Sequence, residues 1–269
     1  MQERHLDRKR YFQEQGVTTE KYVIPYIEDV IPVHKDIRVL EIGCGEGGNL
    51  VPFLKMGCEG VGVDINDKQI KNAKIFMDEI LPDAKSKFIS QNIYDVTADD
   101  IGRFDLIMLR DVIEHIPNQE VFIKHLKTFL KPEGKVFFGF PPWCMPFGGH
   151  QQICRSNFLS KVPYFHLLNR GLYKLILKSF GESNGTIANL IEIKDTGISI
   201  NRFQSIINAN DYQFDKKTFF LINPNYETKF GLKSRVQFKL IQSIPFIRDF
   251  FTTCYYCVIS MKMPMSNQN

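Results

Sequence analysis

The sequence predicts an α/β protein in which an open, mostly parallel sheet is covered by helices on both faces. Strand patterns alternate with helical patterns from residue 37 to residue 140, an order typical of parallel sheets. A cluster of glycines from Gly43 to Gly48 joins the first strand to the helix after it, as expected where a chain turns sharply around a ligand. Two strand patterns near the C-terminus suggest an antiparallel pair at the sheet edge.

The first 36 residues are predicted to form an N-terminal helical cap, because five apolar residues share one helical stripe: Tyr22, Val23, Tyr26, Ile27 and Val30. Residues 37–142 form the predicted core. Its strands are expected at 37–42, 60–64, 87–91, 104–109 and 135–140. Its helices are expected at 47–56, 67–80, 111–116 and 119–130, with a turn at 131–134.

Residues 143–200 break the alternation and are predicted to be a helical lid inserted after the fifth strand. A helix over 165–180 would place Phe165, Leu168, Leu172, Leu175 and Ile176 on one face. The insertion follows the carboxyl end of a strand, where open α/β sheets bind ligands. The C-terminal part, residues 201–269, should contain a helix near 200–210 and strands near 216–222 and 255–261.

The composition narrows the class of function. Thirty-four basic and thirty acidic residues leave a net charge of +4, too weak and scattered to indicate a nucleic-acid partner. No apolar run has the length of a membrane span and the start lacks a signal-peptide pattern, so we expect a cytoplasmic protein. The six cysteines should be reduced, and Cys254 and Cys257 should lie on opposite faces of one strand.

The glycine turn is compatible with two kinds of cofactor. Gly43, Gly45 and Gly48 have the G-x-G-x-x-G spacing of dinucleotide-binding enzymes. Glu41, two residues before the first glycine, would repel a pyrophosphate and suits a ligand with a cationic portion. Asp64 ends the second strand, about twenty residues beyond the first glycine, where an acid can accept both ribose hydroxyls.

Five motifs in order resemble the class I S-adenosylmethionine-dependent methyltransferases over residues 37–142. They are Val39 to Gly47, Gly62-Val63-Asp64, Gln91 to Asp95, Phe104 to Ile107 and Leu130 to Lys135. The resemblance implies a seven-stranded, Rossmann-like, mostly parallel sheet whose last strand is antiparallel. It also implies S-adenosyl-L-methionine as the cofactor.

The resemblance further implies roles for single residues. The backbone from Gly43 through Cys44 and Gly45 to Gly47 would lie against the methionine part, and Asp64 would hold the ribose. Ile65 would pack on the adenine, and Asn92 and Ile93 would border its ring. Asn92 stands where many relatives have an acid. Leu109 and Arg110 would face the sulfonium, with Asp111 neutralising Arg110.

Two histidines are candidates for catalysis. Methyl transfer to a hydroxyl requires a base, and His115 and His150 are predicted near the cofactor end of the sheet and at the start of the lid. Asp111, Glu114, His115 and His150 could alternatively hold a divalent cation, as a similar acid-x-x-Glu-His arrangement does in some relatives. Many relatives carry Glu-His without a metal, so the sequence assigns no metal.

We therefore expect a methyltransferase acting at an oxygen of a small molecule. The alternatives are an NAD-dependent oxidoreductase and a non-catalytic protein that binds an adenosyl cofactor. The lid aromatics Trp143, Phe147, Tyr164 and Phe165 could line a substrate pocket, but a core role is favoured. Arg170, Lys174 and Lys178 are expected on a solvated face rather than a lipid surface. The acceptor and the oligomeric state are not indicated.

Overall fold

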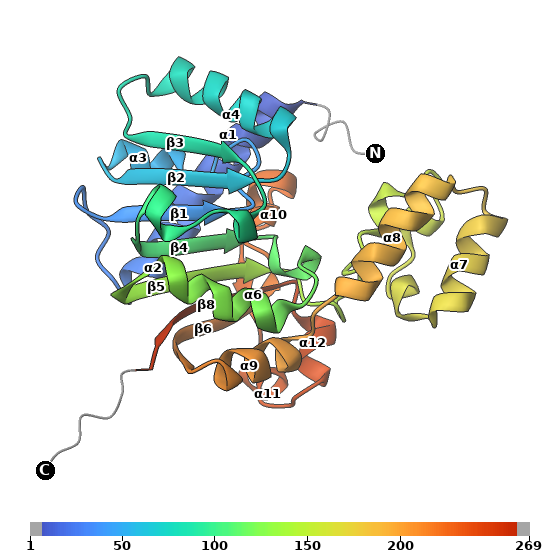
Figure 1. Cartoon of the computed structure of the whole chain (residues 1–269). Coiled ribbons are helices and arrows are strands. Elements are labelled where there is room, and N and C mark those ends of the chain that lie inside the picture. The colour runs from blue at the N-terminus through green and yellow to red at the C-terminus, as the bar shows by residue number, and fades with distance from the viewer. Residues whose placement is uncertain (1–6, 263–269) are drawn as a thin grey trace, which may run out of the picture.

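A computed structural model describes residues 7–262, and its centre is a mixed eight-stranded sheet (Figure 1). The strand order is β3-β2-β1-β4-β5-β8-β6-β7. The ends of the predicted cap (residues 1–6) and of the predicted C-terminal part (residues 263–269) lie outside the described residues. The strands are β1 (Arg38–Ile42), β2 (Glu59–Asp64), β3 (Ser86–Ser90), β4 (Phe104–Arg110), β5 (Leu130–Phe140), β6 (Tyr212–Ile222), β7 (Arg235–Val236) and β8 (Cys254–Met261).

The five parallel strands confirm the predicted alternation. β1 lies between β2 and β4, with Leu40 opposite Val61 on one side and Ile107 on the other. The central strands are buried on both faces, so they read as continuous apolar runs rather than as an alternating pattern. The carboxyl ends of β1, β2 and β4 consequently meet at one edge of the sheet.

The predicted antiparallel pair near the C-terminus is confirmed, because β6 and β8 pair antiparallel. β8 also pairs with β5, so it lies between β5 and β6. The reason is burial: every residue of β8 except Met261 is buried, which requires neighbours on both sides. The edge strand is the two-residue β7, and it brings the expected seven strands to eight. Cys254 and Cys257 belong to different core clusters, as expected for opposite faces.

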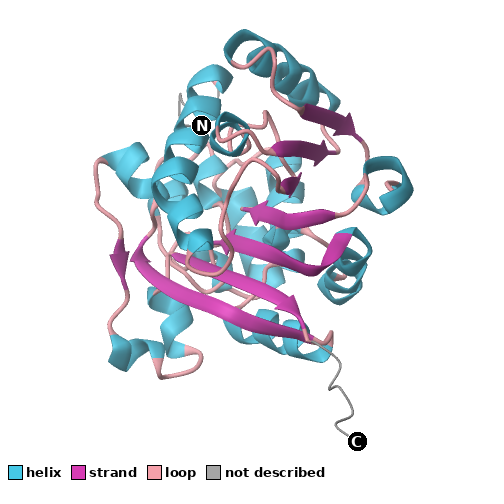
Figure 2. Cartoon of the chain, turned by 90° about the vertical axis from the view of Figure 1, so that its left-hand side faces the viewer, coloured by secondary structure: helices cyan, strands magenta, loops and turns pink. Residues whose placement is uncertain are grey.

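Helices cover both faces of the sheet (Figure 2). One face packs against Phe12, Phe53 and Met77 among others, and the opposite face against Phe122 and Phe203. The first face is covered by α1 (Arg8–Thr18), α2 (Ile24–Glu28), α3 (Val51–Lys55) and α4 (Asp67–Ile80), and the second by α5 (Ala98–Ile101), α6 (Gln119–Leu126) and α9 (Ile200–Ala209).

Three core helices are shorter than predicted. The helix expected over 47–56 begins at Val51, because the glycine turn extends to the residues before it. The segment 111–116 contains only a 3₁₀ turn, since Asp111 has a left-handed backbone with φ of 57°. The α-helix expected over 119–130 ends at Leu126 and is followed by a 3₁₀ turn and by β5. The predicted turn at 131–134 is therefore part of β5, where the pairing with β4 shifts its register.

The lid stands beyond the carboxyl ends of the strands (Figure 1). It contains α7 (Arg170–Ser179) and α8 (Asn184–Thr196) and has its own core, which includes Tyr173 and Leu177. The apolar face predicted over 165–180 is wrong: Leu172 and Leu175 are exposed. The helix begins at Arg170, after Asn169 caps it and a separate 3₁₀ turn ends at Leu167, so its phase differs from the expected one. α8 was not predicted as a separate helix, although Ser183 caps it.

The chain between β6 and β8 adds three short helices, α10 (Asn225–Phe230), α11 (Lys239–Gln242) and α12 (Ile247–Phe251). Within residues 7–262, no helix combines the length and the apolar character that crossing a membrane would take.

The cap helix α1 docks directly on the glycine turn at Gly48. A Cβ placed on Gly48 would lie 2.3 Å from the carbonyl oxygen of Phe12 and 2.9 Å from Oε1 of Gln15. Backbone cannot yield as a flexible side chain can, so the contact requires glycine. α1 therefore holds its place against the turn only while position 48 lacks a side chain.

We expect Gly48→Ala to lower the free energy of unfolding by about 2 kcal/mol, because the added methyl overpacks this contact. Urea unfolding measures the change. Gly185→Ala in α8 is the matched control, since the nearest atom to its Cβ lies 3.9 Å away, and it should be neutral or slightly stabilising. Equal effects of the two substitutions would contradict the docking of α1.

Candidate active site

The glycine turn follows β1 and is packed from behind. Gly43, Gly45 and Gly47 have φ of 69°, 53° and 78°, a region that L side chains rarely adopt. A Cβ on Gly43 would lie 2.5 Å from Val112, and one on Gly47 would lie 2.6 Å from Phe88. Gly45 is less crowded, with the nearest atom at 3.4 Å. The turn is thus a rigid backbone surface that a ligand can approach at Gly45.

Asp64 is held beside this turn at the end of β2. Its Oδ2 accepts a hydrogen bond from the backbone N–H of Gly45 at 2.8 Å, and its Oδ1 accepts one from Asn66 at 2.8 Å. Each carboxylate oxygen retains a further lone pair, so both can accept a hydroxyl. The next side chain, Ile65, is 77% exposed and is available to an aromatic ring.

Glu41 is a buried carboxyl with one unused oxygen. Oε1 accepts a hydrogen bond from Nδ2 of Asn49 at 2.6 Å, and Oε2 has no partner. Burial raises the pKa of Glu41 to about 8, although Asn49 and the Arg110 guanidinium oppose the shift. A cationic ligand group close to Glu41 would favour the ionised form.

Arg110 is buried among polar groups of the cap and the glycine turn. Its Nη1 donates to Oδ1 of Asn49 at 2.6 Å and to Oγ1 of Thr19 at 3.2 Å. Leu109 is packed in the core and offers only its backbone. Arg110 therefore joins the cap to the glycine turn rather than lining an open site.

The other predicted cofactor residues differ in exposure. Asn92 is exposed, and its Oδ1 accepts from the backbone of Tyr94 at 3.2 Å. Ile93 and the Cys44 thiol are buried. The amide of Asn92 is therefore within reach of a ligand, whereas Ile93 and Cys44 mainly shape the wall behind it.

Two residues of α1, Arg8 and Tyr11, lie close to predicted site residues or the glycine turn but were not predicted from the sequence. Arg8 donates from Nε to Oε1 of the buried Glu46 at 2.6 Å, and Tyr11 lies close enough to Arg110 and Asp111 for both to influence its pKa, which burial raises to about 12. Arg8 and Glu46 are 38 residues apart, and no local pattern in the sequence links them.

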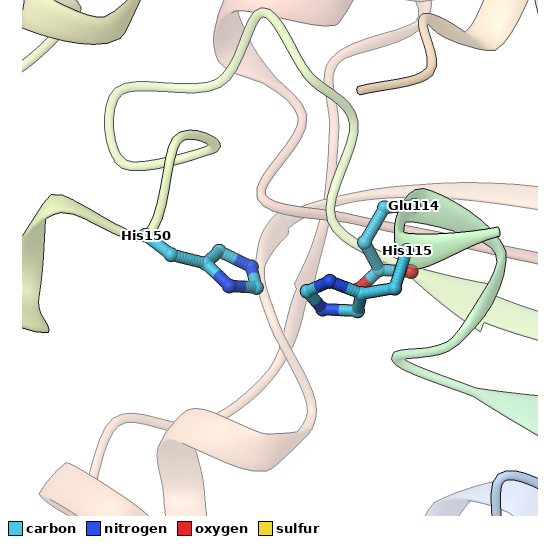
Figure 3. A group of neighbouring side chains, drawn as sticks. All are labelled: Glu114, His115 and His150. Atoms are coloured by element: carbon cyan, nitrogen blue, oxygen red, sulfur yellow. The ribbon is translucent and has the colours of Figure 1, made fainter. Parts of the chain in front are cut away.

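Glu114, His115 and His150 converge at the lid side of the sheet (Figure 3). We call these three residues the acceptor cluster. One ligand atom from each residue lies within 4.8 Å of the others, and the two imidazole centroids are 4.9 Å apart. Glu114 is 3% exposed, and neither of its carboxyl oxygens has a partner. Two histidines far apart in the sequence thus meet beside an unsatisfied buried carboxyl.

Burial shifts the pKa values of the acceptor cluster. It raises the pKa of Glu114 well above the usual range, and Asp111 adds to the effect. It lowers the pKa of His115, and it lowers that of His150 to about 4 with a contribution from His115. Both imidazoles are consequently neutral near pH 7, with lone pairs available for a proton or a cation.

Two cavities lie along α8 of the lid, and one of them reaches the acceptor cluster at His115. One of about 270 Å³ is lined by His115, Asn189, Glu192 and Thr196, with Ile153 and Ile193. A second of about 670 Å³ lies between α7 and α8 and shares Glu192 and Thr196 with the first. The smaller cavity thus gives a small molecule access to His115 beside α8.

The lid aromatics are mainly structural. Phe165 packs on Tyr173 with centroids 4.7 Å apart, and Trp143 packs on His166 at 4.6 Å. Neither cavity is lined by Trp143, Phe147, Tyr164 or Phe165. The favoured core role is confirmed for Phe165 and is wrong for Phe147, which is exposed.

We expect the stability of the protein to depend on pH through Glu41. Its folded pKa of about 8 lies above its usual value of 4.5. The neutral carboxyl contributes its full stability at a pH below the pKa that Glu41 has in the unfolded protein. That contribution is lost as the pH rises through the pKa that Glu41 has in the folded protein. Urea unfolding between about pH 5 and about pH 8 should show the wild type losing stability relative to Glu41→Gln. Parallel curves would contradict the raised pKa.

The chain is similar in sequence to known methyltransferases. A family profile described as a methyltransferase domain matches residues 19–143. The mitochondrial ubiquinone biosynthesis O-methyltransferase of Bos taurus is 27% identical over 145 residues, covering 48% of this chain and 39% of that protein. The enzyme of the same name from Coxiella burnetii (strain Dugway 5J108-111) is 32% identical over 115 residues, covering 43% and 47%. The chain thus spans less than half the length of these curated relatives.

A solved structure shares the fold. Magnesium protoporphyrin IX methyltransferase from Synechocystis PCC 6803, with bound SAH, has a TM-score of 0.54 at 15% identity, covering 92% of this chain and 84% of that one. The residues around the glycine turn fit the cofactor of this class, since Glu41 has an unused buried oxygen and Asp64 has free lone pairs. Residues 19–143 therefore form a methyltransferase domain of the class I family, which uses S-adenosylmethionine rather than a nicotinamide cofactor.

Proposed function

We propose that this protein transfers the methyl group of S-adenosylmethionine to an oxygen of a small molecule. The observation that carries the proposal is the acceptor cluster, in which His115 lines a lid cavity and meets the neutral imidazole of His150 and the buried carboxyl of Glu114. Relatives named O-methyltransferases support the choice of oxygen. A hydroxyl acceptor needs a group that removes its proton, and the histidines of the cluster are suited to that role. An acceptor that is already nucleophilic needs no such group.

The chain's residues divide the task between two places. The bound cofactor supplies an electrophilic methyl group. The glycine turn, Glu41 and Asp64 would hold the cofactor at the carboxyl ends of β1 and β2. His115 and His150 would orient the acceptor hydroxyl and remove its proton, and the displacement then depends on alignment.

The larger lid cavity suits an acceptor with an apolar body and an anionic group. Ile187 and Ile191 provide apolar wall, and Arg170, Lys174 and Lys178 stand along the other side. Arg170 pairs with Asp195 at 2.8 Å, so Lys174 and Lys178 are the cations best placed for a carboxylate or phosphate. The basic face predicted to be simply solvated thus lines a cavity.

The acceptor cluster also fits a divalent cation. Two imidazoles and one carboxylate are a donor set used for Zn²⁺ and similar transition metals, and Glu114 has both oxygens unused. A bound cation would lower the pKa of a hydroxyl that joined its coordination shell. A nitrogen that binds a cation cannot accept a proton, so His115 and His150 would then orient rather than deprotonate.

Incubation with methyl-labelled S-adenosylmethionine and a panel of acceptors tests the function. The panel should pair phenols and hydroxy acids with amine and thiol analogues of the same carbon skeleton, each with and without a phosphate or carboxylate. We expect the methyl group on oxygen in anionic, apolar acceptors. Transfer to nitrogen or carbon alone would contradict the proposal. Cofactor binding without transfer to any acceptor would favour the non-catalytic alternative.

We predict that His115→Ala and His150→Ala each lower kcat by about a hundredfold to ten-thousandfold. The Kd for S-adenosylmethionine should be unchanged, because the acceptor cluster is separate from the glycine turn. His34→Ala is the control, since its imidazole is 54% exposed. Unchanged turnover in both cluster variants would remove the histidines from the mechanism.

We predict that Zn²⁺ or Mn²⁺ raises the Tm of EDTA-treated protein by several degrees, because a ligand that binds the native state stabilises it. Glu114→Gln and His150→Asn should abolish the rise. Mg²⁺, which prefers oxygen ligands, should have a smaller effect. If no divalent cation shifts the Tm and chelation leaves activity intact, the cluster works without a metal.

A further inference from the structure

The segment 231–252, between β6 and β8, turns its apolar side chains outward. We call this stretch the apolar segment. It contains β7, α11 and α12, and its large hydrophobic residues are more than a third exposed almost throughout. These exposed residues are Leu232, Val236, Phe238, Leu240, Ile244, Phe246, Ile247, Phe250 and Phe251. Such a concentration of exposed apolar surface marks an interaction site.

The same segment turns polar side chains inward. Gln237 is 3% exposed and donates from Nε2 to Oγ1 of the buried Thr252 at 2.6 Å. Asp249 is 1% exposed and accepts from the backbone N–H of Ile200 at 2.8 Å. The bond of Gln237 links two parts of the segment, and the bond of Asp249 fixes the segment to α9. The outward apolar residues are therefore part of an ordered surface and not of a loose loop.

The exposed charges of the apolar segment have one sign. Lys233, Arg235 and Lys239 are exposed. Its single acidic residue, Asp249, is buried. With Arg248 included, four cations and one acid give the segment +3 of the chain's net +4. Exposed apolar and cationic groups together match the boundary between the acyl chains and headgroups of an anionic bilayer.

Phe246 is the most unusual residue of the surface. It is 70% exposed and has φ of 67°, a backbone conformation that costs free energy for a bulky residue. It follows Pro245 at the bend between α11 and α12. The strained bend presents an aromatic ring to the surroundings instead of burying it.

We propose that the apolar segment docks on the surface of a bilayer containing anionic lipids. Its apolar side chains would enter the acyl boundary while Lys233, Arg235 and Lys239 contact lipid phosphates. A second copy of the chain is a poorer occupant. A two-fold contact would bring the cations of one copy towards those of the other, with no exposed acid in the segment to pair with them.

The docked surface lies next to the lid. The hydroxyl of Tyr164 donates to the carbonyl oxygen of Phe250 at 3.1 Å, and their rings lie 6.0 Å apart. α12 is near the base of the lid in Figure 1. Docking would bring the lid cavities close to acceptors carried in the membrane. This consequence rests on the proposed function, whereas the docking itself does not.

Flotation with phosphatidylcholine vesicles, with and without about 30 mol% phosphatidylglycerol, tests the proposal. The full chain should float with the anionic vesicles, and less so as salt rises. Leu240→Ser combined with Phe246→Ser should weaken binding by at least about tenfold. Lys233→Glu combined with Lys239→Glu should weaken it by at least about twentyfold, at about fivefold per lost cation.

Matched controls are available on α4, at the opposite edge of the sheet. Ile75→Ser replaces an apolar residue that is 54% exposed, and Lys68→Glu with Lys74→Glu makes the same charge change as the segment pair. Neither should weaken flotation. Circular dichroism checks that each variant is folded. If the variant with Leu240→Ser and Phe246→Ser is unfolded, the variant with Lys233→Glu and Lys239→Glu alone decides the test. The proposal would be overturned if the wild type did not float, or if both segment variants floated as well as the wild type. It would also be overturned if the wild type bound no vesicles and instead formed a concentration-dependent dimer that the segment variants lose. Vesicle binding requires neither cofactor nor acceptor, so it can fail independently of methyl transfer.

Discussion

The buried guanidinium of Arg110 links the N-terminal cap to the glycine turn at the end of the central strands. It is 8% exposed and donates to Asn49 in the glycine turn and to Thr19 in the cap, while Asn49 donates to Glu41 on β1. Removing one partner of a buried charge is strongly destabilising. The cap, the turn and the two central strands are therefore fixed together, and the cofactor surface is formed before any ligand arrives. The close approach of α1 to Gly48 adds to the same joint.

The two ends of the active site differ in how well their polar groups are satisfied. At the position proposed for the ribose, Asp64 already accepts two backbone hydrogen bonds. Glu41 has one unused oxygen, and Glu114 has two. Buried polar atoms without partners are costly, so their placement at the cofactor and acceptor positions is best explained by ligands that satisfy them. The smaller lid cavity is lined by His115, and neither lid cavity is lined by residues of the glycine turn.

The sequence was informative where neighbouring residues determine structure. The strand–glycine–helix unit, the alternation up to β5 and helix α4, found at Asp67–Ile80, all follow from local periodicity and turn chemistry. Long-range geometry was less accessible. The position of β8 inside the sheet depends on which strand needs two neighbours, and the helix phase of the lid depended on Asn169 as its cap. The hydrogen bonds of Arg110 could not be predicted, because Asn49 and Thr19 are distant from it in the chain. The meeting of His115 with His150 was anticipated as a possibility, but the lack of any partner for Glu114 became visible only in three dimensions.

The central claim is that the buried carboxyl of Glu41 carries a proton in the free protein and ionises when the cationic part of S-adenosylmethionine binds. Isothermal titration of S-adenosylmethionine near pH 7 in two buffers with different ionisation enthalpies measures the protons released on binding. Because the pKa of Glu41 in the free protein is about 8, the account predicts release of nearly one proton by the wild type and none by Glu41→Gln, which should also bind more weakly. Binding with no proton release in the wild type, or with equal release in the variant, would contradict it.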